Sequence, residues 1–268
     1  VGAGGVDHLV SFFHDADEGV RHFAAETLGN VPGEASASSA AALLEHTDAP
    51  VRRAALMGIG KLKADGRVHA AAVSQHLHDN DFAARLAAIQ ALNELEAASE
   101  AHLVGALQKD DNKGIRQAAV TALSKMGAKG AEEALGFLDD EDAAVRQAAV
   151  RVFSPLHSKL PADVAVPHAD SVCCKLIDED WRVRLAAAVA LGDLHAGQFC
   201  YQVALLCNDE NHQVRRSAIT TLKKIGGTAA HVAAFLKDDD GGVRKEAEQI
   251  YKELAANGPD DGDISEVE

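Results

Sequence analysis

Apolar residues recur along this chain at the spacing of a buried helix face. One copy of the stripe consists of Val183, Ala186, Ala187, Ala190 and Leu191, which follow the i, i+3, i+4, i+7, i+8 pattern. Equivalent stripes begin at Ile115 and at Val145. Alanine is frequent in them, and alanine is the strongest helix former. The pattern therefore predicts a series of amphipathic helices that pack closely against one another.

Each stripe begins at a Val-Arg pair or at a close variant of that pair. The successive arginines are separated by 31, 33, 31, 30, 38, 31 and 29 residues. A fixed period in this range is the sequence mark of a solenoid, in which each unit contacts only its neighbours. The chain is therefore expected to be an array of short repeats instead of one closed core.

An Asp or Asn stands three residues before the apolar member of every pair. These residues are Asp17, Asp48, Asp81, Asn112, Asp142, Asp180, Asn211 and Asp240. They are predicted N-caps of the main helices, each stabilising its helix by about 1 kcal/mol. A shorter helix is expected before each cap, for example over residues 103–107 and 231–236. Gly29, Gly60, Gly192 and Gly226 are interpreted as chain-reversal positions near the helix ends.

The repeated pattern Leu-x-Asp-x-Asp-x-x-Val-Arg-x-x-Ala-Ala-x-x-Leu-Gly resembles the HEAT-repeat family. Within that family it is most similar to the short HEAT-like repeats of phycobilisome (bilin) lyases, over about residues 6–254. The resemblance implies an all-α fold: an α-solenoid, wound as a right-handed superhelix, of about eight helix-pair repeats. We expect the solenoid to span residues 1–256 and an acidic, disordered tail to span 257–268.

The resemblance also implies two ladders of stacked side chains between successive repeats. The aspartate ladder would be Asp15, Asp79, Asp110, Asp140, Asp178, Asp209 and Asp238. The arginine ladder would be Arg21, Arg52, Arg85, Arg116, Arg146, Arg184, Arg215 and Arg244. His46 occupies the second aspartate position and departs from the pattern. A row of arginines also suggests a phosphate track, but an aspartate near almost every arginine favours the structural interpretation.

Three segments depart from the repeat. The 38-residue interval contains Pro155, Pro161 and Pro167, which cannot all lie inside helices, so we expect an extended loop there. In the last repeat Glu246 stands where other copies have a core alanine, which indicates a polar cap. The first repeat has no such mark, and Phe12, Phe13 and Phe23 concentrate there.

Charge and cysteine content restrict the classes of partner. The 268 residues include 26 basic and 41 acidic side chains, a formal net charge of −15. This balance argues against nucleic acid or an anionic membrane as the main ligand, and it favours a basic protein segment. No apolar run reaches transmembrane length. Four cysteines indicate free thiols in a reducing compartment, cytoplasmic or organellar, and Val1 in place of Met indicates a processed or truncated product.

The sequence contains no recognisable catalytic or metal motif. No histidine is followed by glutamate, so the His-Glu iron ligands of deoxyhypusine hydroxylase, a HEAT-repeat enzyme, are missing. Cys173, Cys174, Cys200 and Cys207 are candidate zinc or redox ligands. However, they lack a Cys-x-x-Cys spacing, and buried hydrophobic packing is the favoured interpretation. We therefore predict no catalytic, cofactor-binding or metal-binding residues.

The functional hypotheses follow from the solenoid. The first is a non-catalytic scaffold or adaptor that binds a partner protein on its concave face and acidic rim. Trp181, Arg182 and Phe12 are its candidate partner-binding residues, although Trp181 could instead cover the adjacent turn. The alternative is a bilin lyase or chaperone-like factor acting on a tetrapyrrole-binding protein, which a bilin absorbance shift would reveal. A third hypothesis is a subunit of a larger assembly.

Overall fold

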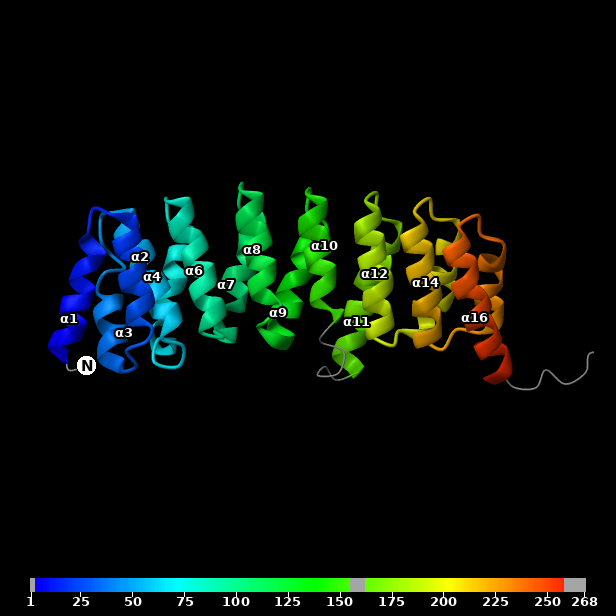
Figure 1. The fold of residues 1–268 in the computed structure, drawn as a ribbon, viewed down its shortest axis with the longest axis horizontal. Helices are drawn as coiled ribbons and strands as arrows, with labels where there is room; N and C mark the ends of the chain where they lie inside the picture. The colour runs from blue at the N-terminus through cyan, green and yellow to red at the C-terminus, as the bar shows by residue number, and fades with distance from the viewer. Residues whose placement is uncertain (1–2, 155–161, 258–268) are drawn as a thin grey trace, which may run out of the picture. The chain divides into compact units, whose positions relative to one another are not determined.

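The computed structural model describes residues 3–154 and 162–257, and within those segments it contains helices and turns but no strand (Figure 1). Each repeat is a pair of helices, A and B. The B helices are α2 (Glu18–Leu28), α4 (Ala49–Lys61), α6 (Phe82–Glu94), α8 (Lys113–Leu123), α10 (Ala143–Val152), α12 (Trp181–Asp193), α14 (His212–Lys224) and α16 (Gly241–Asn257). The expected all-α solenoid of helix pairs is confirmed.

Each A helix is shorter than the B helix of its own repeat, and the A helices are often extended by 3₁₀ turns. They are α1 (Ala3–Ser11), α3 (Glu34–Ala41), α5 (Ala70–Gln75), α7 (Ala101–Gly105), α9 (Gly127–Ala134), α11 (Ala162–Cys173), α13 (Cys200–Ala204) and α15 (Ala229–Val232). The 3₁₀ segments are η1 (Phe12–His14), η2 (Arg67–His69), η3 (His76–His78), η4 (Ala98–Glu100), η5 (Ala106–Lys109), η6 (Leu135–Phe137), η8 (Cys174–Ile177), η9 (Gly197–Phe199), η10 (Leu205–Asn208) and η11 (Ala233–Lys237).

Contacts between residues divide the chain into two units, residues 1–140 and 141–268. In unit 1 the helices α2, α4, α6 and α8 pack side by side in chain order (Figure 1). In unit 2 the helices α10, α12, α14 and α16 do the same. The apolar stripe of each B helix forms the core, and residues such as Val51, Ile115 and Val183 are almost completely buried. Hydrophobic burial between neighbouring repeats therefore holds each unit together.

The A–B turns begin the B helices as the sequence predicts, with one exception. The side chains of Asp17, Asp81, Asn112, Asp142, Asp180, Asn211 and Asp240 accept backbone N–H groups of the first helical turn. Asp48 makes no such bond. The residue two places after it is Pro50, which has no N–H to donate. Asp48 therefore occupies the predicted N-cap position of α4 but lacks the predicted side-chain hydrogen bond, for a local reason.

Three of the glycines do not serve chain reversal. Gly60 and Gly192 lie inside α4 and α12, and Gly29 has an ordinary helical φ of −59°. Only Gly226, with φ at +80°, has the left-handed backbone that glycine favours. A Cβ on Gly60 would lie 2.9 Å from the Cα atom of Ala91 in the next B helix. Close approach between helices, not a turn, explains why Gly60 has no side chain.

Replacing Gly60 with alanine should therefore destabilise unit 1, although alanine favours helix formation. The added methyl group meets backbone atoms of α6, which cannot rotate away, and overpacking of this kind costs about 2 kcal/mol. Gly241→Ala is the matched control, because its Cβ would come no closer than 3.6 Å to Arg244. Urea denaturation of both variants checks this. A Gly60→Ala midpoint at or above the wild-type value would contradict the proposed crowding.

Parts of the sequence-based expectation lie outside the described residues. Pro155 and Pro161 of the expected loop fall there, as do residues 258–268 of the expected acidic tail, whereas Pro167 lies within α11. In the part of the chain that the structure describes, no helix is long and apolar enough to cross a membrane.

The polar cap of the last repeat is not formed by the residue that the sequence indicated. Glu246 accepts hydrogen bonds from the side chains of Arg216 and Thr220, so it faces the preceding B helix. Glu248 is exposed instead, although its counterparts four residues after each ladder arginine are apolar and buried. Examples of these counterparts are Leu56, Ile89 and Ala188. Glu248 therefore marks the polar end of unit 2.

Candidate functional site

A groove crosses three successive B helices of unit 1. Its volume is about 350 Å³. It is lined by His22 and Glu26 of α2, by Met57, Gly60 and Lys61 of α4, and by Ala87, Gln90, Ala91, Asn93 and Glu94 of α6. The small residues Gly60, Ala87 and Ala91 leave the space, and Met57 supplies an adaptable apolar surface. We call this the B-helix groove. Its mixed apolar and polar lining suits a segment of another protein.

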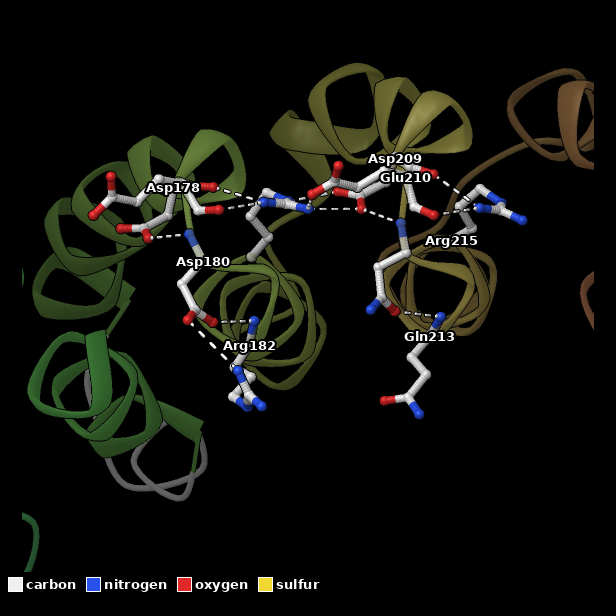
Figure 2. Close-up of polar contacts among 10 residues, drawn as sticks. Asp178, Asp180, Arg182, Asp209, Glu210, Gln213 and Arg215 are labelled. Atoms are coloured by element: carbon white, nitrogen blue, oxygen red, sulfur yellow. Dashed lines mark hydrogen bonds and ion pairs between the residues drawn. The ribbon is translucent and has the colours of Figure 1, made fainter. Parts of the chain in front are cut away.

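The ladder residues meet between consecutive repeats. In five rungs the arginine Nε and Nη2 atoms donate to both carboxylate oxygens of an aspartate in the next repeat, at 2.6 to 3.0 Å. These rungs are Arg52–Asp79, Arg116–Asp140, Arg146–Asp178, Arg184–Asp209 and Arg215–Asp238. Such bidentate, charge-assisted bonds are the strong class of hydrogen bond. Figure 2 shows Asp209 and Arg215 within this arrangement.

Each rung also ties the arginine to its own A–B turn. Arg184 Nη1 donates to the backbone carbonyls of Asp178 and Glu179, at 2.9 and 3.1 Å. The partner carboxylate is equally constrained, because Asp209 Oδ1 accepts the backbone N–H of Asn211 at 2.9 Å (Figure 2). Every polar atom of the pair therefore has a defined partner, as buried ions require. This geometry leaves these arginines little capacity to bind phosphate.

The rung at Arg85 has weaker geometry than the others. Arg85 Nε lies 3.1 Å from Asp110 Oδ2, but the N–H is not aligned for a hydrogen bond. The last ladder arginine, Arg244, donates from Nη1 to the carbonyl of Asp238 within its own turn. The rungs therefore differ in how completely their charges are satisfied.

The first rung lacks a carboxylate. Arg21 donates from Nη1 to the carbonyls of Asp15 and Ala16, but its buried Nε has no partner among the described residues. His46 occupies the place of the aspartate, and its Nδ1 accepts the N–H of Asp48 at 3.0 Å. Its ring also contacts the ring of His14, with 4.9 Å between centroids. His46 thus accepts the same backbone hydrogen bond in the turn as the ladder aspartates, but it forms no ion pair with Arg21.

Replacing His46 with aspartate should complete this rung and stabilise the first two repeats. An aspartate would keep the bond from the Asp48 N–H and offer a second oxygen to Arg21. We expect the free energy of unfolding to rise by about 1.5 kcal/mol, the lower end of the range for hydrogen bonds to charged groups. Urea denaturation measures it. His46→Asn is the matched control, because it keeps the turn bond without the charge. Equal midpoints for the two variants would refute the ion-pair explanation.

A second row of acids lies outside the ladder in unit 2. The side chains of Glu179, Glu210 and Asp239 are 83 to 99% exposed, and each lies within 3.5 Å of a ladder arginine. We call these three residues the acidic rim. The arginines are already neutralised by buried aspartates, so the rim presents net negative charge to solvent. Exposed acids of this kind attract basic partners at long range.

The predicted partner-binding residues do not gather at one site. Trp181 is partly exposed at the start of α12, and the guanidinium of Arg182 lies 4.7 Å from its ring centroid. Arg182 also lies 3.6 Å from Asp180 (Figure 2). Phe12, 39% exposed, belongs to the first repeat in unit 1. Phe13 is fully buried and Phe23 is 69% exposed, so the three phenylalanines occupy different environments.

Comparison with known proteins identifies the repeats. The family model of HEAT repeats matches residues 6–93, 70–154 and 171–252. The chain belongs to the HEAT-repeat family. The expected resemblance to this family is confirmed. A comparison with curated proteins finds no match.

Two of the solved structures that resemble this chain, those with TM-scores above 0.5, share its fold at low sequence identity. The Escherichia coli protein YibA is 16% identical with a TM-score of 0.62, over 93% of this chain and 95% of that one. An engineered protein is 17% identical with a TM-score of 0.58, over 94% and 79%. The CpcE–CpcF complex of phycocyanin lyase from Nostoc sp. is 20% identical with a TM-score of 0.46, over 92% and 93%.

Three of the four thiols of this HEAT-repeat chain, those of Cys173, Cys200 and Cys207, are poorly suited to nucleophilic chemistry. Burial raises the pKa of Cys173 to about 11, and burial also raises the pKa of Cys200 and Cys207. At neutral pH these groups are therefore protonated, whereas reactive cysteines need a lowered pKa. In the described segments no group of three or more metal-ligating side chains is close enough to hold an ion.

The neighbouring histidines His76 and His78 lie in different environments. His76 is buried, with Nδ1 3.2 Å from Asp79 Oδ2, so it belongs to the rung formed by Arg52. His78, two residues later, is exposed. The two rings thus point to different environments, as their spacing predicts.

The residues of the B-helix groove were not found by sequence reasoning. They are contributed by helices about 31 to 33 residues apart, and no local motif joins them. One signal is available in retrospect. Glu26, Met57 and Gln90 all stand five residues after a ladder arginine, and Met57 is an apolar residue at this solvent-facing position. Aligning the repeats and reading the solvent-facing positions across them would have indicated a continuous surface.

Proposed function

We propose that this chain is a non-catalytic scaffold that binds a segment of a partner protein in the B-helix groove. The observation that carries the proposal is the groove itself, because it spans three repeats and joins an apolar floor to flanking polar groups. Peptide grooves of helical proteins combine apolar anchoring positions with polar groups that fix orientation. HEAT repeats, built from stacked helix pairs, offer such extended surfaces.

The acidic rim supports a second element of the proposal, the charge of the partner. Glu179, Glu210 and Asp239 are exposed and follow one another on successive turns of unit 2. A partner with a basic segment would associate faster in this field, and the effect would weaken as salt screens it. The rim and the groove therefore make separable contributions, one to association rate and one to specificity.

The experiment is affinity capture from a native extract with quantitative mass spectrometry, using the full chain and two variants. Met57→Lys places a charge on the apolar floor of the groove, and we expect at least a tenfold loss of the proteins captured by the wild type. Val189→Lys is the matched control, because Val189 is an exposed B-helix residue in unit 2. Capture that survives Met57→Lys unchanged would overturn the proposed role of the groove.

The rim is tested by kinetics with the captured partner. The triple charge reversal Glu179→Lys, Glu210→Lys and Asp239→Lys should lower the association rate constant by about tenfold at low ionic strength. The difference should disappear at high salt, where the Debye length falls to about 3 Å. An association rate that the reversal leaves unchanged at low salt would exclude a basic partner.

A further inference from the structure

A second pocket of unit 1 continues the B-helix groove towards the C-terminal ends of the B helices. Its volume is about 350 Å³, and it is lined by Lys63, Asn93, Glu94, Glu96 and Lys125. We call it the end pocket. Asn93 and Glu94 also line the B-helix groove, so the two spaces adjoin. A segment that binds over Met57 in the groove can therefore extend into the end pocket.

Two side chains of the end pocket stand where the backbone favours glycine. Lys63 and Glu96 have φ angles of 49° and 51°, in the left-handed region. Each follows its ladder arginine by eleven residues, and at that position two other repeats have Gly127 and Gly226. A residue with a Cβ atom adopts this conformation less readily than glycine does. Strained residues of this kind concentrate at binding sites, where the side chain is needed.

The surroundings of Lys63 give no structural reason for its side chain. His195, in the corresponding position of unit 2, has a φ of 49°, and its Nδ1 lies 3.3 Å from the backbone carbonyl of Lys224. Glu96 Oε2 lies 3.5 Å from Arg67 Nη2. Within the described segments the amino group of Lys63 has neither a hydrogen bond nor an ion pair. A ligand of the end pocket is therefore the best explanation for a lysine at this position.

The charges of the end pocket suit an acidic ligand. Lys125, like Lys63, forms no ion pair among the described residues. Of the two lining carboxylates, that of Glu96 already lies beside Arg67, which leaves Glu94. Two ammonium groups therefore face one available carboxylate, in a chain whose net charge is −15. Such a local excess of positive charge complements a negatively charged group of a partner.

A buried acceptor lies where the groove meets the end pocket. The Oδ1 atom of Asn93 is buried, and no donor reaches it from the described residues. A buried amide oxygen without a donor is unfavourable. Asn93 stands eight residues after its ladder arginine, where α4 and α12 have Gly60 and Gly192. A backbone N–H of a segment that crosses from the groove to the end pocket would satisfy this oxygen.

We propose that the partner segment in the B-helix groove carries an aspartate or glutamate side chain that binds Lys63 and Lys125 in the end pocket. The segment also donates a backbone N–H to Asn93. This inference rests on the proposed function, because Met57 in the groove contacts the apolar residue of the same segment. The contact acts at short range and fixes the position of the segment, whereas the acidic rim acts on the association rate.

The distance along α4 sets the spacing of the motif. Lys63 follows Met57 by six residues, a rise of about 9 Å at the helical value of about 1.5 Å per residue. An extended segment covers about 3.3 Å per residue. The acidic residue should therefore stand about three positions from the apolar residue.

The probe is a phage-displayed library of random peptides of about twelve residues, selected on the immobilised full chain. We expect the enriched peptides to pair a large apolar residue with Asp or Glu at about this spacing. The most enriched peptide is then synthesised with a fluorescein label, and its affinity is measured by fluorescence anisotropy. Lys63→Gly, Lys125→Gln and Asn93→Ala should each weaken binding, and the double variant of the two lysines should weaken it at least tenfold.

Lys63→Gly separates binding from stability. It restores the residue that the backbone favours, so its urea midpoint should equal or exceed that of the wild type while its peptide affinity falls. His195→Gly is the matched control, because it makes the same change at the same φ in unit 2. It should leave the peptide affinity unchanged.

The outcomes distinguish this inference from the proposed function. Peptides that need Met57 but show no preference for an acid, or that bind the double lysine variant as tightly as the wild type, would overturn the inference and leave the groove in place. Selection of the same peptides by Met57→Lys and by the wild type would overturn the proposed function, and this inference with it.

Discussion

Replacing Arg215 with alanine is expected to destabilise unit 2 by about 3 kcal/mol, because it leaves a buried carboxylate without its partner. The side chain of Asp238 is only 3% exposed, and both of its oxygens receive arginine N–H groups at 2.6 and 2.8 Å. Water cannot replace these bonds without opening the interface between α14 and α16. The substitution also frees the carbonyls of Asp209 and Glu210, which Arg215 Nη1 contacts.

The adjacent Arg216 provides a matched control. It is also an arginine of α14 paired with a glutamate of α16, but its side chain is 62% exposed. Exposed ion pairs contribute little because solvent screens them. Arg216→Ala should therefore melt close to wild type by circular dichroism, and Arg215→Ala should melt well below both. Hydrogen exchange should place the change in α14 and α16. Indistinguishable melting temperatures for the two variants would show that the rung is not structural.

The fold was predictable because the same sequence pattern occurs in eight successive repeats. A Val-Arg pair, an Asx cap before it and an alanine-rich stripe after it locate every B helix. The A helices are less regular, and several reduce to one or two turns extended by 3₁₀ segments, a detail that periodicity does not encode. The apolar stripes of the B helices likewise give no sign of the division into two units after residue 140. Local pattern therefore determines element type well and element length poorly.

The errors came from positions where two effects compete. Asp48 has the correct residue type for a cap, but Pro50 removes the donor. Gly60 stands near a helix end in sequence, but close contact with the next helix decides its identity. The apolar stripe of the last repeat, taken by itself, indicates Glu246 as the end cap. Deciding between Glu246 and Glu248 requires knowing which side of α16 faces α14, which is a tertiary fact.

The candidate site was less predictable than the fold. The ladder pairs could be anticipated from the resemblance, since each residue recurs with the repeat. The B-helix groove depends on side chains that vary between repeats, such as Met57, Gln90 and Glu94. Varying positions form no local motif, and in a single sequence only an alignment of the repeats places them on one surface. In a solenoid the variable surface residues determine what is bound, whereas the recurring residues stabilise the packing between repeats.

Acid is expected to unfold the array, because three complete rungs, those of Asp79, Asp178 and Asp238, contain a carboxylate that is stabilised in its charged form. Hydrogen bonds from Arg52 and Arg215 lower the pKa of Asp79 and of Asp238 below the usual aspartate value. Burial raises the pKa of Asp178, but hydrogen bonds from Arg146 and from the Asp180 N–H outweigh it, and the net pKa is lowered. The folded state therefore binds these protons less readily than the unfolded chain.

The direction of the pH dependence follows from this difference. A group with a lowered folded-state pKa contributes its full stabilisation above the unfolded pKa of about 3.9, and the contribution is lost as pH falls below that value. Stability should thus be nearly constant from pH 7 to about pH 5 and should fall steeply below about pH 4, because several rungs titrate together. Protonation of Asp238 also leaves the buried Arg215 without an anion. Helical circular dichroism should be lost cooperatively in this range.

The Arg215→Ala variant tests whether the ladder carboxylates cause the unfolding at low pH. In Arg215→Ala the pKa of Asp238 is no longer lowered by its partner, so this variant should lose less stability on acidification than the wild type. The difference in unfolding free energy between the two proteins, measured by urea denaturation, should therefore narrow as pH falls from 6 to about 3. If the difference stays constant across that range, the ladder carboxylates do not drive acid unfolding and another set of groups must.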